Sequence, residues 1–114
     1  MTKQDLINEY VLHLTGYYSY NGGYYEENNC YSKVDSKFPL EVNSSINALG
    51  HDIIITKIND DSICIKVDNK NDAILKCGDK ICIEYYNRSS GSNDFFVSDV
   101  MELFASLVQK DSSF

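Results

Sequence analysis

Apolar and polar residues alternate most regularly between residues 52 and 87. The alternation is clearest in 62–68 and again in 80–86. Successive side chains of a strand point to opposite faces, so this pattern predicts strands with one buried and one wetter face. The run 53–55 is apolar on both faces and predicts a central strand. The short run 73–77 suits a sheet edge.

The breaks between these strands have turn chemistry. Asn, Asp and Ser occupy 59–62, and Asn and Asp recur in 69–72; their side chains bond readily to turn backbone. Gly78-Asp79 suits a tight turn with positive φ. None of these gaps is long enough for a parallel crossover, so consecutive strands should pair antiparallel.

Helical periodicity marks both ends of the chain. Residues 2–14 predict a helix with a capping box at Thr2 and Asp5 and a stop at Gly16. Residues 94–110 predict a second helix. Its apolar stripe comprises Val97, Val100, Met101, Phe104, Leu107 and Val108.

These patterns together predict an α+β fold in one domain, residues 1–114. The expected core is an antiparallel β-meander of about four to six strands, flanked by an N-terminal and a C-terminal α-helix. Pro39 favours an edge position for a short strand around it. Residues 44–50 predict one helical turn, and the polar run 87–93 predicts a loop.

Residues 16–31 hold six of the nine tyrosines. Asn21-Gly22 is a strong hairpin signal. The simplest interpretation is an aromatic hairpin packed on the sheet. The alternative is a recognition surface, because tyrosine supplies large amphipathic contact area at low entropic cost. The candidate partner-binding residues are Tyr17, Tyr18, Tyr20, Tyr24, Tyr25, Glu26 and Glu27.

The chain carries a formal net charge of −7. This charge argues against direct binding to nucleic acid or to an anionic membrane, since both need basic patches. No basic start precedes an apolar run at the N-terminus, and no apolar run approaches the roughly 20 residues of a membrane span. We therefore expect a cytoplasmic location.

Motifs for catalysis, metals and cofactors are missing from the sequence. The chain has no C-x-x-C pair, no phosphate-binding glycine loop and no EF-hand spacing in 68–79, so we expect no metal and no cofactor. A nucleophile–base pair formed by Cys30 or Cys77 with His13 or His51 stays open as a minor alternative.

The sequence therefore favours a binding protein over an enzyme. We expect a small acidic inhibitor or immunity-type module that neutralises a basic, possibly nucleic-acid-binding, partner protein. A self-assembling subunit, possibly a homodimer, is the alternative from a different class. A small Cys/His enzyme is the third.

Overall fold

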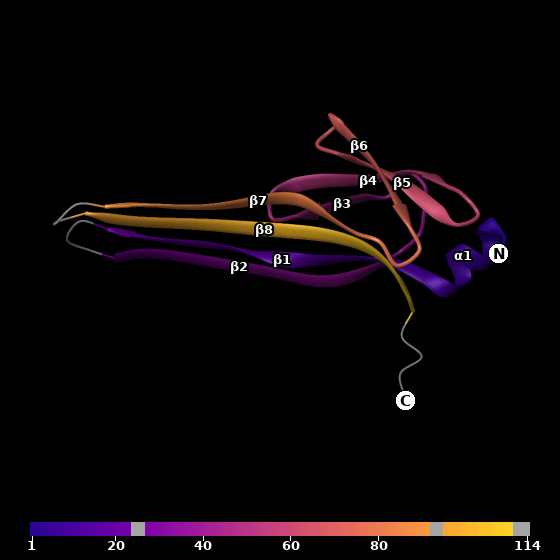
Figure 1. Cartoon of the computed structure of the whole chain (residues 1–114), viewed down its shortest axis with the longest axis horizontal. Helices are drawn as coiled ribbons and strands as arrows, with labels where there is room; N and C mark the ends of the chain where they lie inside the picture. The colour runs from indigo at the N-terminus through magenta and orange to yellow at the C-terminus, as the bar shows by residue number, and fades with distance from the viewer. Residues whose placement is uncertain (24–26, 92–94, 111–114) are drawn as a thin grey trace.

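The computed structural model describes residues 1–23, 27–91 and 95–110, without the side chains of residues 27 and 28. No helix in these ranges is long and apolar enough to cross a membrane. Figure 1 shows the elements, which in chain order are α1 (Lys3–Glu9), β1 (Tyr10–Gly23), β2 (Glu27–Pro39), β3 (Ser45–Ala48), β4 (His51–Ile58), β5 (Ser62–Val67), β6 (Asn71–Lys76), β7 (Lys80–Gly91) and β8 (Phe96–Gln109).

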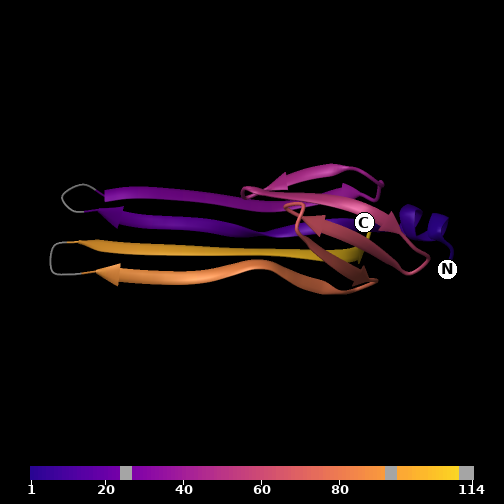
Figure 2. The same cartoon turned by 90° about the horizontal axis from the view of Figure 1, so that it is seen from above.

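The strands form two four-stranded antiparallel sheets. The long sheet has the order β2-β1-β8-β7, and the small sheet has the order β3-β4-β5-β6. The small sheet lies over only the end of the long sheet that adjoins α1 (Figures 1 and 2). The result is an elongated molecule with extents of 59 × 37 × 19 Å.

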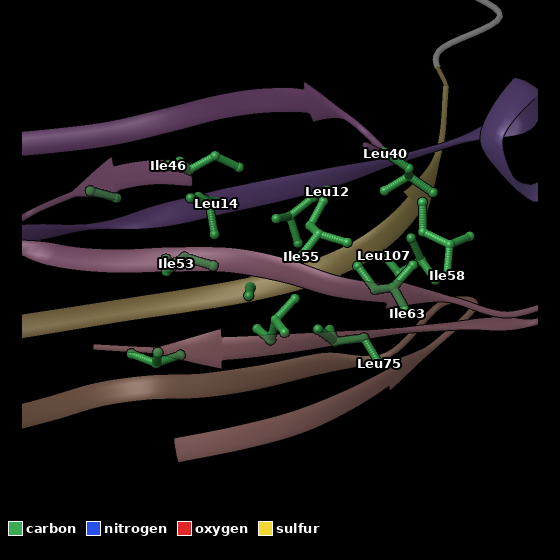
Figure 3. Packing of buried hydrophobic residues seen from close by; sticks show 14 of the residues in the cluster. Leu12, Leu14, Leu40, Ile46, Ile53, Ile55, Ile58, Ile63, Leu75 and Leu107 are labelled. Carbon is green, nitrogen blue, oxygen red and sulfur yellow. The ribbon is translucent and has the colours of Figure 1, made fainter. Parts of the chain in front are cut away.

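The hydrophobic core lies between the small sheet and the covered part of the long sheet (Figure 3). Alternate residues of β1 and β8 point into it from one side, and β4, β5 and β6 contribute from the other. Burying each such aliphatic side chain contributes about 1.5–3 kcal/mol relative to leaving it exposed. The fully buried large side chains are Leu6, Leu12, Leu14, Ile53, Ile55, Ile63, Ile65, Leu75, Leu103 and Leu107.

The predicted meander is confirmed for three strands and wrong for the fourth. β4 is central and β6 is an edge, as the sequence indicated. β7, however, joins the long sheet. The turn before it has the expected positive φ at Gly78 (+85°), but its backbone bonds to Leu107 of β8 through the Gly78 N–H (2.8 Å) and the Asp79 carbonyl (3.1 Å). These bonds carry the chain from one sheet to the other.

The N-terminal helix is confirmed with a different end. Thr2 and Asp5 form the predicted capping box. The helix ends at Glu9, and β1 begins at Tyr10 instead of continuing to residue 14. The reason is tertiary: from Tyr10 onward the chain pairs with β8, and from Val11 it also pairs with β2.

The predicted C-terminal α-helix is wrong, because residues 96–109 form strand β8. β8 pairs with β1 on one side and β7 on the other, and these two ladders outweigh a helical pattern that is also compatible with a strand. Leu103, Ala105 and Leu107 alternate into the core.

Two smaller predictions are also wrong. Residues 45–48 form β3, which turns into β4 through positive φ at Leu49 (+49°) and Gly50 (+83°). Residues 87–91 extend β7, because each pairs with a residue of β8. The described chain therefore has eight strands instead of about four to six. Pro39 ends β2, an edge strand as expected.

One transverse row of the long sheet marks where the small sheet ends. This boundary row consists of Val34, Gly16, Leu103 and Glu84, which are register partners across the four strands. Ile83 forms a bulge beside it, between Cys82 and Glu84. We call the part of the long sheet between this row and α1 the covered half. The part on the other side of the row is the projecting half, which comprises residues 17–23, 27–33, 85–91 and 96–102.

Two local features hold the boundary row. A Cβ added to Gly16 would lie 2.0 Å from the backbone oxygen of Glu102, so β8 leaves no room for a side chain at this position. His51 of the small sheet bonds through Nδ1 to Asp68 (2.6 Å) and through Nε2 to Glu84 of β7. The His51 imidazole therefore links the small sheet to the long sheet at the boundary row, where the small sheet ends.

Candidate functional site

Beyond the boundary row, no second sheet covers either face of the long sheet (Figure 1), although Met101 next to the row is buried. A sheet usually buries at least one face against another layer, because a single layer leaves too much apolar surface in water. A sheet that carries aromatic side chains without such a layer is a candidate interaction surface. The projecting half is therefore the place to look for function.

Strand alternation divides the predicted tyrosine cluster between the two faces. Tyr17 points to one face of β1, and Tyr18 and Tyr20 point to the other. The three tyrosines therefore do not form one surface, and their role in binding a partner stays a prediction. Tyr24, Tyr25 and Glu26 lie outside the described residues, and Glu27 is described only by its backbone at the start of β2.

Cross-strand partners share a face, so the register defines two surfaces of the projecting half. The Tyr17 face comprises Tyr17, Tyr31, Lys33, Tyr85, Val100 and Glu102. The Tyr18 face comprises Tyr18, Tyr20, Tyr86, Arg88, Val97, Asp99 and Met101.

The Tyr17 face presents aromatic rings around a hollow. The rings of Tyr17 and Tyr31 stack with centroids 6.2 Å apart. Tyr31 is 65% exposed and Tyr85 62% exposed, so most of both side chains is open to contact. An open hollow of about 270 Å³ lies among Tyr17, Tyr31, Phe104 and their neighbours. This face therefore offers apolar contact area without a covering layer.

Charges border the rings of the Tyr17 face. Glu102 lies between Tyr17 and Tyr85 in the register, and Lys80 sits 4.7 Å from the centre of the Phe104 ring. Burial and then the Glu102 carboxylate raise the pKa of Tyr17 above its ordinary value. A tyrosine hydroxyl already keeps its proton near neutral pH, so the raised pKa only widens the pH range in which Tyr17 can donate a hydrogen bond.

The Tyr18 face is built around one ion pair. Arg88 donates to Asp99 over 2.7 Å, and its guanidinium lies 4.2 Å from the centre of the Tyr86 ring. The Asp99 bond raises the pKa of Arg88. Burial, and after it the charge of Asp99, raise the pKa of Tyr18. The second carboxylate oxygen of Asp99 is buried and has no hydrogen-bond partner among the described residues.

The residues of the Tyr17 face that sequence reasoning missed come from distant segments. Tyr31 lies in the tyrosine-rich segment but is not among the predicted partner-binding residues. Tyr85 belongs to the predicted meander. Glu102 and Phe104 were assigned to a helix. The available signal was strand alternation in 96–109, which would have placed Val100, Glu102 and Phe104 on one face.

The histidines and Cys77 lie outside the two faces, whereas the exposed Cys30 is the register partner of Tyr20 on the Tyr18 face. His13 bonds to Asp35 (2.6 Å), and His51 bonds to Asp68 and Glu84. Cys77 lies against the Asp61 carbonyl oxygen (3.5 Å). Its thiol also raises the pKa of Tyr10, as the largest cause of that shift. In the described ranges no group of three or more potential ligands could hold a metal ion.

No family model matches this chain, and no curated protein and no solved structure matches it either. The function must therefore be inferred from the geometry of the two faces.

Proposed function

We propose that this protein is a small protein-binding module of the inhibitor or immunity type, which contacts a basic partner protein through the Tyr17 face. One observation carries the proposal. Tyr17 and Tyr31 line an open hollow, and the exposed Tyr85 lies in the same transverse row as Tyr17, on a sheet face that no other described part of the chain covers.

The chemistry of these rings suits a protein partner. A tyrosine ring buries large area at low entropic cost, and its hydroxyl can still bond at the edge of a contact. Tyrosine is also enriched among the few residues that dominate binding energy, each of which costs about 2 kcal/mol or more when truncated. Two such rings in the lining of the hollow, with Tyr85 exposed on the same face, could anchor a side chain or loop of the partner.

The preference for a basic partner rests on the net charge of −7. The Tyr17 face itself is mixed, because it carries both Lys33 and Glu102, and Lys80 lines the same hollow. Much of the acidity lies elsewhere, for example at Asp60 and Asp61 in the exposed turn before β5. Attraction of a basic partner would therefore act at long range and speed association, whereas the aromatic rings would set the lifetime of the complex.

The test compares two matched variants on β8. Val100→Glu places a charge on the Tyr17 face, and Val97→Glu places the same charge on the opposite face; both valines are half-buried in the projecting half. Native lysate of the source organism is passed over immobilised wild type and both variants, and retained proteins are identified by mass spectrometry. The partner is then purified and its affinity measured at several salt concentrations.

The proposal expects one basic protein that is retained by wild type and by Val97→Glu and lost from Val100→Glu. Its affinity for Val100→Glu should fall at least about tenfold, or 1.4 kcal/mol. Its association rate should fall as salt rises. Equal retention by both variants, or a partner with no net positive charge, would contradict the proposal.

A further inference from the structure

One face of the long sheet is covered by the small sheet in the covered half and uncovered in the projecting half. The edge of the small sheet therefore forms a step on this face. The Tyr18 face continues, past the boundary row, the face that carries Leu12, Leu14 and Leu107 in the core. Over the covered half the small sheet packs on this face, and over the projecting half nothing in the described chain does (Figures 1 and 3). Packed sheets lie about 10 Å apart, so the step is one sheet layer high.

We propose that the Tyr18 face is covered by the same face of a second copy of this chain, related by a two-fold axis. The projecting sheet of each copy then occupies the layer that the small sheet of the other leaves empty. Two open single layers become one continuous two-layer sandwich. Such an interface is isologous, since each copy contributes the same residues.

The charges of the Tyr18 face permit this contact. Although the chain carries −7, the described charged side chains of this face are Arg88 and Asp99, which pair with each other. The face therefore has no net charge of its own. Repulsion between the remaining charges is screened over about 8 Å at physiological salt. The Tyr17 face, with Lys33 and Glu102 open, lacks this pairing.

The area is adequate for a modest dimer. Four strands about 4.8 Å apart, over about seven residues at 3.3 Å each, give a flat footprint of roughly 440 Å² per copy. Two copies bury roughly 900 Å² before the protruding side chains are counted, which lies in the range of weak, transient interfaces, below about 1,200 Å². We therefore expect a dimer that forms at micromolar or higher concentrations.

The test is the mass in solution of wild type and the two β8 variants, by sedimentation equilibrium up to about 1 mM protein. Wild type should approach twice the chain mass. Val97→Glu should stay at the chain mass, because it places two charges in the dry interface. Val100→Glu should still dimerise, with a Kd within about threefold of wild type. Wild type that stays monomeric, or two variants that dimerise equally, would overturn the proposal.

A second pair of variants protects the test against misfolding. Ser90 and Ser89 are adjacent, exposed residues of β7; the register places Ser90 on the Tyr18 side of the sheet and Ser89 on the Tyr17 side. Ser90→Glu should weaken the dimer at least about tenfold, and Ser89→Glu should not. Equal effects would count against the dimer. This inference does not depend on the proposed function, since a failed lysate capture leaves the self-association result unchanged.

Discussion

The two halves of the long sheet use the same four strands for different purposes. In the covered half, alternate residues such as Leu12 and Leu14 are fully buried, and the small sheet covers them. In the projecting half, the same positions along β1 carry Tyr18 and Tyr20, which are half-buried. Only the side chains and the second layer change across the boundary row. The comparison indicates that pairing of strands sets the length of the sheet, whereas packing decides which part is core and which part is surface.

The largest expected difference between the halves concerns large-to-small substitutions on β8. Leu107→Ala, in the covered half, should lower the free energy of unfolding by about 2–5 kcal/mol, because it leaves a cavity in the core. Val97→Ala, on the same face of the same strand, should cost less than about 1 kcal/mol. Urea denaturation measures both. Similar losses at the two positions would mean that the projecting half has a core of its own.

Glycine substitutions sharpen the position of the boundary. Gly16→Ala should destabilise the protein by about 1–3 kcal/mol, because its Cβ would meet the backbone of Glu102. Gly22→Ala is the matched control in the projecting half, since its Cβ would meet only the side chain of Tyr20, which can move. Thermal unfolding should show a clear drop for the first variant and little change for the second. A reversed order would show that β8 can accommodate a side chain at residue 16.

The polar tie at the boundary predicts an acid dependence of stability. The backbone N–H of Asp52, and after it His51, lower the pKa of Asp68 below 3.8. A carboxyl with a depressed folded pKa contributes stability above its unfolded pKa and loses it as pH falls through the folded value. Stability should therefore decrease below about pH 4, and Asp68→Asn should reduce that decrease. Denaturation at pH 7 and pH 3 tests this, with Asp60→Asn in an exposed turn as control; equal pH dependence in both variants would contradict it.

The smallest expected effect lies at the far end of the covered half. Thr2→Ala removes the cap of α1 and should cost about 1 kcal/mol. Gln4→Ala, which removes only an exposed side-chain bond to Asn8, should cost a few tenths of a kcal/mol. Circular dichroism at 222 nm during urea titration reports both. A cap variant as stable as the control would show that α1 depends on its packing through Leu6 alone.

Much of the small sheet could be predicted from the sequence, because its signals are local. Residues 53–55 and 62–67 show strand patterns, and short turns impose antiparallel pairing. The capping box of Thr2 and Asp5 is equally local. The sequence could not predict that β7 joins the long sheet. The bonds that direct it there join Gly78 and Asp79 to Leu107, which is distant in the sequence.

The candidate site was predictable only in part. The tyrosine-rich segment indicated an aromatic surface, and Tyr17, Tyr18 and Tyr20 do lie in the projecting half. The sequence did not show that alternation separates them, because Asn21-Gly22 suggested a turn where β1 in fact continues to Gly23. In 96–109 the apolar residues fit both a helix and a strand, and only the ladders with β1 and β7 decide between them.

Amide hydrogen exchange at two protein concentrations tests most directly whether the projecting half is a surface completed by another chain. The account predicts that amides of Tyr18, Tyr20 and Met101 exchange more slowly at high concentration, because mass action favours the covered state. Amides of Leu12, Leu14 and Leu103 should be strongly protected at both concentrations. Protection that is equal in the two halves and independent of concentration would contradict the account.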